Sequence, residues 1–137
     1  MMNEPISSIM STEIISFSPD DKLSDVLESF KSHKIHHVPI VDGTGKLVGL
    51  ITTSDLLWLN RSFDDYSSIR VGDVMSTKLA RLGPDSKVGT AAEIFLKNWF
   101  HALPIVDDND TLVGIVTTFD VLMYEYKKEY PKEYATD

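Results

Sequence analysis

Apolar residues in the first half of the chain follow two different spacings. Between positions 23 and 30 they recur at i, i+3, i+4 and i+7, which is the spacing of one face of an amphipathic helix. Residues 37–41 and 47–52 are short apolar runs on either side of a segment, 42–45, that contains one aspartate and two glycines. Two such runs around such a turn predict a β-hairpin.

The same order of patterns returns 65 residues further along the chain. A second helical stripe covers residues 88–99, and two more apolar runs flank a turn at residues 107–110. Residues 6–59 align with residues 71–124 without a gap, and 20 of the 54 aligned pairs are identical. We therefore expect two copies of one structural unit.

Each copy is expected to begin with a short strand, at residues 14–17 and 79–82, and to end with a second helix, from about Ser54 and Phe119. The predicted unit is thus β-α-β-β-α. One unit of this size is too small to cover its own sheet. We therefore predict an α+β fold in which two repeats pack sheet to sheet about a pseudo-two-fold axis.

These predictions divide the chain into four parts. The first repeat covers residues 6–59, a polar linker covers 60–70, the second repeat covers 71–124, and a C-terminal helical extension and tail cover 125–137. The helix of this extension is expected to end at Pro131, because proline cannot donate the backbone hydrogen bond that continues a helix.

Composition narrows the range of functions. The absence of cysteine excludes a thiol nucleophile, a disulfide framework and a thiolate zinc site. A formal net charge of −8 argues against sequence-independent binding to nucleic acid. No apolar run is long enough to span a bilayer and the first residues do not resemble a signal peptide, so we expect a cytoplasmic protein without membrane contact. The common nucleophile, phosphate-loop and zinc-protease motifs are missing, so we expect no enzymatic activity.

Both copies carry the same short motifs in the same order. They are Met-Ser-Thr at 10–12 and 75–77, Pro-Ile-Val-Asp at 39–42 and 104–107, Leu-Val-Gly at 47–49 and 112–114, and Thr-Thr-x-Asp at 52–55 and 117–120. This set resembles the CBS domain, named for cystathionine β-synthase, and two in tandem resemble a Bateman module. The resemblance covers about residues 6–124. It implies two clefts that bind AMP, ADP, ATP or S-adenosylmethionine, in a module that regulates an attached or partner protein.

The Thr-x-x-Asp sequence, at Thr52 and Asp55 and again at Thr117 and Asp120, has two interpretations. It is the pattern of a capping box, which satisfies free N–H groups at a helix start. A helix N-terminus also attracts phosphate, and a carboxylate there can accept hydrogen bonds from both ribose hydroxyls. By resemblance to the family, Thr52 and Thr117 would contact phosphate, and Asp55 and Asp120 would contact ribose.

Histidines precede the proline-containing run in both copies. The resemblance makes His36, His37 and His101 candidate phosphate ligands, but the basic residue of the stronger family pattern is missing and Ala102 aligns with His37. A histidine that is mostly neutral at pH 7 attracts phosphate only modestly. The alternative is a structural role for His36 and His101. We expect no metal site, because consecutive strand residues point to opposite faces.

An adenine ring would need an apolar slot with backbone groups at its edge. The resemblance places this slot at four residues of each copy: Ile14, Ile15, Val38 and Pro39, and Leu79, Ala80, Leu103 and Pro104. The alternative is that these side chains belong to the core.

The predicted second helices are unusually apolar, at residues 56–59 and 121–124. Monomers rarely expose large apolar patches, so this surface favours a partner, and we predict a homodimer with an isologous interface. Two functions remain open at this point. One is an adenosine-nucleotide sensor that acts on an unknown partner protein, and the other is an interaction or dimerisation module without a small ligand.

Overall fold

The computed structural model describes residues 2–59 and 61–133. The first repeat contains the helices α1 (Leu23–His33) and α2 (Thr53–Leu57) and the strands β1 (His37–Val41) and β2 (Leu47–Thr52). The second contains α3 (Val88–Lys97), β3 (Ala102–Val106), β4 (Leu112–Thr117) and α4 (Thr118–Glu129). The described chain also contains four 3₁₀ segments: η1 (Ile6–Ser8), η2 (Phe63–Ser68), η3 (Val71–Asp73) and η4 (Pro131–Glu133). Each strand pair forms its own two-stranded sheet, which confirms the predicted α+β class.

The strand expected at the start of each copy is reduced to a single bridge. Phe17 pairs in parallel with Ile40 of β1, and its N–H donates to the carbonyl of Pro39 over 3.2 Å. Pro39 has no N–H of its own, so it cannot extend this ladder. The same arrangement recurs at Leu82 in the second copy. α4 ends at Glu129, two residues before Pro131, as expected, and residues 134–137 of the expected tail lie outside the described residues.

The two compact units of the structure each combine parts of both repeats. One unit contains the chain up to Ile14, residues 80–108 and the chain from Val113 on, and we call it the α4 unit. The other, the α1 unit, contains residues 15–79 and 109–112. The opening segment of each repeat is therefore packed in the unit that contains the helices of the other repeat.

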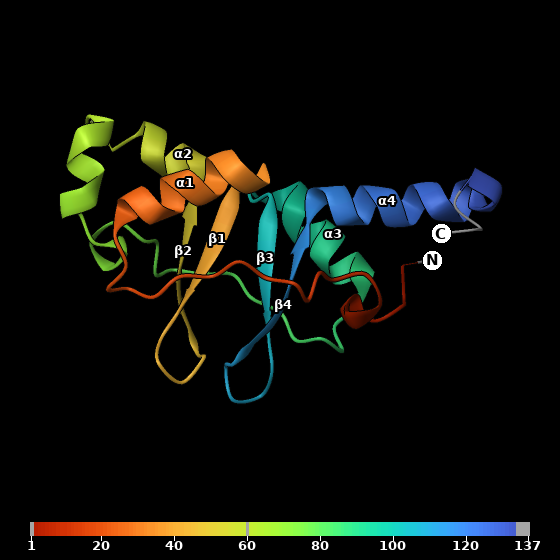
Figure 1. Cartoon of the computed structure of the whole chain (residues 1–137). Helices are drawn as coiled ribbons and strands as arrows, with labels where there is room; N and C mark the ends of the chain where they lie inside the picture. The colour runs from red at the N-terminus through yellow and green to blue at the C-terminus, as the bar shows by residue number, and fades with distance from the viewer. Residues whose placement is uncertain (1, 60, 134–137) are drawn as a thin grey trace. The chain divides into compact units, whose positions relative to one another are not determined.

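The core of the α1 unit forms between α1 and the hairpin β1–β2, which lie side by side in Figure 1. The strands are antiparallel, with Val38 opposite Ile51, and both side chains are fully buried. Leu23 and Val26 on the apolar face of α1 are also fully buried, which confirms the helical stripe. Tyr66 of η2 is only 1% exposed and joins this core, so part of the segment expected as a linker is folded into the unit.

The first segment of the chain is tied into the α4 unit by backbone bonds and one buried side chain. The N–H of Ile6 donates to the carbonyl of Ser86 over 2.7 Å, and Ser11 and Ile115 exchange backbone hydrogen bonds of 2.9 and 3.0 Å. The Ile6 side chain is fully buried in a cluster with Ala91, Leu103, Ile105 and Val116. The turn η1 that carries Ile6 lies close to α3 in Figure 1.

The opening segment of the second repeat makes the equivalent contacts in the α1 unit. The N–H of Val71 donates to the carbonyl of Asp21 over 2.8 Å, and Ser76 and Leu50 exchange backbone hydrogen bonds of 2.9 and 3.0 Å. These four residues align with the four that tie down the first segment, because the shift is 65 at every position. The sequence repeat is thus matched by a repeat of contacts.

A methionine of each opening segment lies against a strand glycine. A Cβ atom built on Gly114 would lie 2.4 Å from Sδ of Met10, and one built on Gly49 would lie 2.4 Å from Sδ of Met75. Only glycine leaves room for these methionines. The Met-Ser-Thr motif of each repeat therefore packs on the Leu-Val-Gly motif of the other repeat.

Gly49→Ala is expected to lower the free energy of unfolding by about 1–3 kcal/mol through overpacking. The new Cβ would also lie 3.0 Å from Cβ of Met75, an atom that cannot move away without the backbone. Urea denaturation of the wild type and the variant measures the difference. In a Met75→Ala background the contacts with Sδ and Cγ are removed and only the contact with Cβ remains, so the same substitution should cost clearly less. An equal cost in both backgrounds would contradict the proposed contact.

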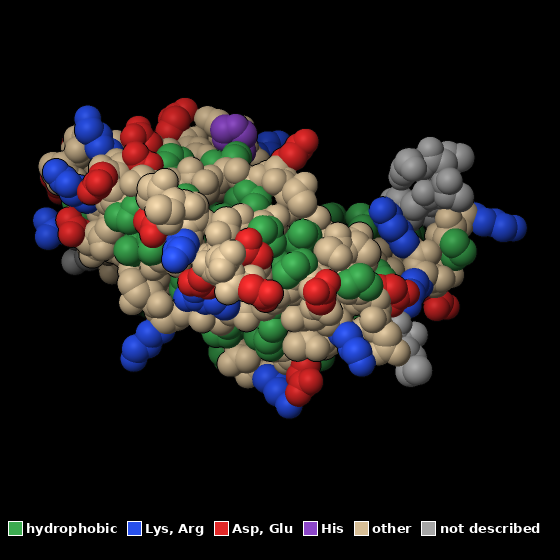
Figure 2. Space-filling view, turned by 90° about the horizontal axis from the view of Figure 1, so that it is seen from below, with side chains coloured by type: hydrophobic (Ala, Val, Ile, Leu, Met, Phe, Trp, Pro, Cys, Tyr) green, Lys and Arg blue, Asp and Glu red, His purple; other side chains and the backbone are tan. Residues whose placement is uncertain are grey.

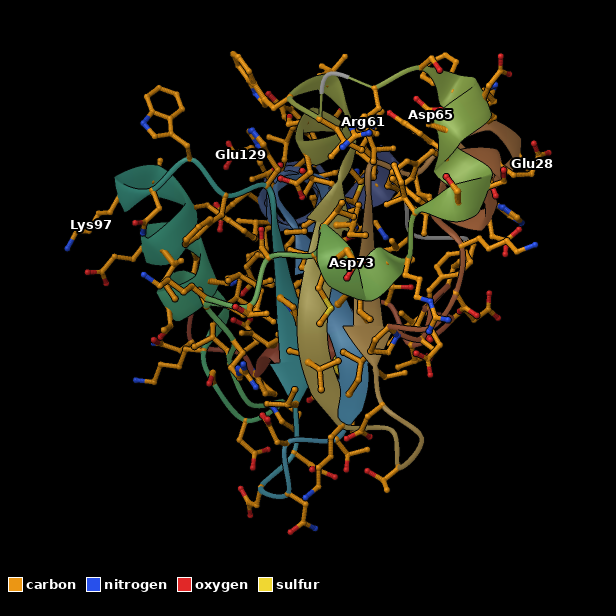
Figure 3. All side chains as sticks on the ribbon, turned by 90° about the vertical axis from the view of Figure 1, so that its left-hand side faces the viewer. Glu28, Arg61, Asp65, Asp73, Lys97 and Glu129 are labelled. Atoms are coloured by element: carbon orange, nitrogen blue, oxygen red, sulfur yellow. The ribbon has the colours of Figure 1, made fainter. Side chains whose placement is uncertain are left out.

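On the face shown in Figure 2, charged side chains of both signs are dispersed, with apolar side chains between them. Glu28 of α1 and Lys97 of α3 extend outward from their helices in Figure 3. Several large apolar side chains are also exposed, Trp58 by 87% and Trp99 by 95% of their surface. Within residues 2–59 and 61–133, every helix is too short or too polar to cross a membrane.

Candidate functional site

Both Thr-x-x-Asp sequences form capping boxes where a strand passes into a helix. At the start of α2, the N–H of Asp55 donates to the Thr52 hydroxyl over 3.2 Å, and the N–H of Thr52 donates to Oδ2 of Asp55 over 2.8 Å. At the start of α4, Thr117 and Asp120 make the same two bonds at the same distances. The capping interpretation is therefore correct for both copies.

Capping does not use all the hydrogen-bonding capacity of these groups. Each threonine hydroxyl accepts from the aspartate N–H, so its own hydrogen can still be donated to another oxygen. Each aspartate places Oδ2 on the threonine N–H, and an ionised carboxylate can accept several further bonds. All four side chains are partly exposed. The capping box thus orients a hydroxyl donor and a carboxylate acceptor on the same helix end.

The histidines that precede β1 and β3 are joined to these helix ends through their backbone. The carbonyl of His36 accepts from the N–H of Thr53 over 2.9 Å, and that of His101 accepts from Thr118 over 3.0 Å. The side chains of His36 and His101 are exposed, and that of His37 is half-buried. Ala102, at the position of His37, is buried. The structure therefore brings a histidine and a Thr-x-x-Asp sequence together in each copy.

The predicted adenine slot divides between core and partly exposed positions. Val38 and Leu103 are fully buried members of the two cores, and Pro39 and Pro104 are buried beside them in β1 and β3. At these positions only backbone groups remain to line a slot.

The four other predicted slot residues are partly exposed. The exchange of opening segments divides them between the two units, which the sequence did not indicate. Ile14 belongs to the α4 unit, together with Asp120, although it lies in the first repeat. Leu79 belongs to the α1 unit, together with Asp55. Ile15 packs on the core of the α1 unit and Ala80 on the core of the α4 unit. An alignment of the repeats contains no signal of this exchange, because packing within a copy and packing between copies give the same aligned residues.

A pocket of about 500 Å³ opens beside Asp120 in the α4 unit. One wall is a single face of α4, and the other is the end of η1 and the residue after it. The lining residues are Ser8, Ile9, Asp120, Met123, Tyr124, Lys127 and Lys128. Its volume lies within the range of small-molecule sites. Sequence reasoning missed it, because Ser8, Ile9 and the two lysines lie outside the repeated motifs.

Glu4 connects the first segment to this face of α4. Its carboxylate accepts a hydrogen bond from the Tyr124 hydroxyl and pairs with the ammonium of Lys128 over 3.1 Å. These two contacts lower the pKa of the Glu4 carboxyl to about 2, and the same cluster raises the pKa of Lys128. Lys128 also lies 4.7 Å from the centre of the Tyr124 ring. Both charges of the pair are therefore present at neutral pH.

Other titratable groups have structural roles. Oδ1 of Asp42 accepts from the hydroxyl and the N–H of Thr44 and from the N–H of Lys46, which closes the first hairpin turn. The Thr44 hydroxyl is the main cause of the lowered pKa of Asp42.

Across the described part of the chain, no three His, Asp or Glu side chains lie close enough together to hold a metal ion.

Comparison with known proteins identifies the repeated unit. The sequence profile of the CBS domain matches residues 6–60 and again residues 71–127. Inosine-5′-monophosphate dehydrogenase of Methanocaldococcus jannaschii is 32% identical over 120 residues, which are 88% of this chain and 23% of that enzyme. The chain therefore spans less than a quarter of this relative, and it spans 48% of MJ0188 from the same organism.

Solved structures of similar fold contain adenosine ligands. CBSX2 of Arabidopsis thaliana, in complex with AMP, aligns with a TM-score of 0.83 at 25% identity, over 92% of this chain and 98% of CBSX2. The CBS domain pair of MJ0100, in complex with 5′-methylthioadenosine and S-adenosyl-L-methionine, aligns with a TM-score of 0.76 at 27% identity. That alignment covers 90% of this chain and 97% of the pair.

Proposed function

The chain belongs to the CBS domain family and carries two copies of the domain. We propose that it is a regulatory module that binds an adenosine-containing ligand. The observation that carries the proposal is the duplicated helix end, where a threonine hydroxyl can still donate and an aspartate can still accept. The AMP complex of CBSX2 and the adenosyl complex of MJ0100 support it, because both have the same fold.

In this proposal each aspartate accepts from the two hydroxyls of a ribose. Asp55 serves one site and Asp120 the other. Thr52 and Thr117 donate to phosphate, and the exposed side chains of the neighbouring histidines can turn toward the same group. The backbone next to the slot residues, and the partly exposed Ile14 and Leu79, would hold the adenine.

Melting experiments with AMP, ADP, ATP and S-adenosylmethionine test the proposal. A ligand present at a hundredfold excess over its Kd stabilises a folded protein by about 2.7 kcal/mol. For a chain of this length that corresponds to a rise in Tm of roughly 5–12 °C. GMP and inorganic phosphate at equal concentration serve as controls. If millimolar concentrations of all four adenosine ligands leave the Tm unchanged, the chain is not a nucleotide sensor.

We also propose that the chain forms a homodimer through exposed apolar helix faces. Phe119, Leu122 and Tyr126 are exposed on α4 at i, i+3 and i+7, which makes one continuous apolar stripe. Leu57 and Trp58 are exposed where α2 ends. Such surfaces favour burial against a second copy of the same patch. If melting shows no ligand effect, a dimerisation or interaction module without a ligand remains the function that these faces support.

Leu122→Glu is expected to convert the dimer into a monomer, because a carboxylate would have to be buried in an apolar interface. Sedimentation equilibrium at several concentrations measures the mass. Thr90→Glu adds the same charge at an exposed position of α3 outside the stripe and should leave the mass unchanged. A monomeric wild type, or a dimer that survives Leu122→Glu, would overturn the proposed interface.

A further inference from the structure

The pocket beside Asp120 continues along α4, away from the Thr117 hydroxyl. Its lining residues on α4 follow Asp120 at i+3, i+4, i+7 and i+8, so they form one face of the helix. Side chains of a helix lean toward its N-terminus, which favours the pocket side of α4 for both lysines. The Lys128 ammonium lies at Glu4 and over the Tyr124 ring. The rise of a helix puts the Cα atoms of Asp120 and Lys127 about 10 Å apart.

The charges in this pocket differ from those at the histidine end of the site. The positions that would bring a basic residue near Thr117 hold His101, whose side chain is exposed, and the buried Ala102. The α4 face instead presents two lysines. One of them, Lys128, is held in position by Glu4 and by the Tyr124 ring. Ile9 and Met123 add apolar surface to the lining of the pocket.

We propose that this pocket is an anion subsite for the phosphate chain of a nucleotide whose ribose is held by Asp120. The inference rests on the proposed function and adds a preference for nucleotides with more than one phosphate. The Thr117 hydroxyl keeps the α-phosphate, and Lys127 and Lys128 attract the β- and γ-phosphates, which extend from it along α4. A nucleoside di- or triphosphate therefore binds more tightly than the monophosphate. The carboxylate of Glu4 competes for Lys128, and the phosphate chain must therefore displace or share that contact.

Isothermal titration of the full chain with adenosine, AMP, ADP and ATP at low ionic strength tests this subsite. Affinity is expected to rise with each added phosphate beyond AMP. Lys127→Gln should weaken ATP binding about five- to tenfold and leave adenosine binding within about twofold, because it removes one charge-assisted contact. Raising the salt concentration should reduce the advantage of ATP over adenosine. The matched control is Lys132→Gln, an exposed lysine in η4 outside the pocket, which should bind like the wild type.

The outcomes separate this inference from the proposed function. If AMP and ATP bind equally, or if Lys127→Gln weakens adenosine and ATP binding to the same extent, the lysines do not hold the β- and γ-phosphates and only the subsite is overturned. If tripolyphosphate alone binds as tightly as ATP, the pocket is an anion site unconnected with the ribose contact, which also overturns the inference. If none of the adenosine ligands binds at all, the proposed function itself fails. An ATP preference that disappears in Lys127→Gln supports both.

Discussion

Ile6→Ala is expected to lower the free energy of unfolding by about 2–4 kcal/mol, the typical cost of an alanine replacement at a buried aliphatic site. The Ile6 side chain is fully buried and is the contribution of the opening segment to the fully buried cluster of the α4 unit. Its removal leaves a cavity between this segment and residues about a hundred positions away in the sequence. Thermal unfolding should show a Tm lower by roughly 8–15 °C.

Two variants control for other effects of this substitution. Ile6→Val retains most of the side chain and should cost only about 0.5–1.5 kcal/mol. Ser7→Ala changes an exposed side chain in the same turn and leaves its backbone hydrogen bond to Pro84 intact, so it should have little effect. If Ile6→Ala were no more destabilising than Ser7→Ala, the packing of the first segment in the α4 unit would be wrong.

Asp120→Ala is expected to weaken binding of an adenosine ligand about 10- to 100-fold, or by about 1.4–2.7 kcal/mol, because it removes the acceptor for two ribose hydroxyls. The substitution also removes half of a capping box, which costs stability of about 1 kcal/mol. The two effects must be separated. Affinity is therefore measured by titration well below the Tm of the variant.

A modified ligand isolates the ribose contact. The wild type should bind 2′-deoxyadenosine more weakly than adenosine, whereas Asp120→Ala should bind the two nearly equally. Asp55→Ala provides the matched substitution at the other helix end, in a helix of only five residues. Because the twelve-residue α4 has the more complete dipole and Asp120 lines a pocket, we expect the larger effect at Asp120. Unchanged discrimination in both variants would remove the aspartates from the ribose site.

The sequence predicted the order of elements because the spacings that carry it are local. The stripe around Leu23 and Val26, the hairpin turn at Asp42 and the capping boxes at Thr52 and Thr117 all depend on residues a few positions apart. The opening strands were overpredicted for a related reason. An apolar run around Phe17 has strand character, but only the structure shows that the proline of β1 limits its pairing to one bridge.

The candidate site was predicted only as far as its motifs extend. The backbone of His36 and of His101 lies next to a helix start with a Thr-x-x-Asp sequence, because in each copy a hairpin, β1–β2 or β3–β4, leads directly into that helix. The pocket beside Asp120 was missed, because its second wall comes from Ser8 and Ile9, more than a hundred residues away in the sequence. Nor does any local pattern reveal that Met10 packs on Gly114, since a contact with the aligned Gly49 would give the same sequence.

The exchange of opening segments has a consequence for the cooperativity of folding. Neither half of the chain holds all the residues of a complete core, because Ile6 belongs to the α4 unit and Val71 to the α1 unit. If the α4 unit opens, it releases the opening segment up to Ile14, and the residues that follow this segment belong to the α1 unit. The two halves of the chain are therefore coupled by chain connectivity. We expect heat to unfold them in one transition, although the sequence contains two CBS repeats.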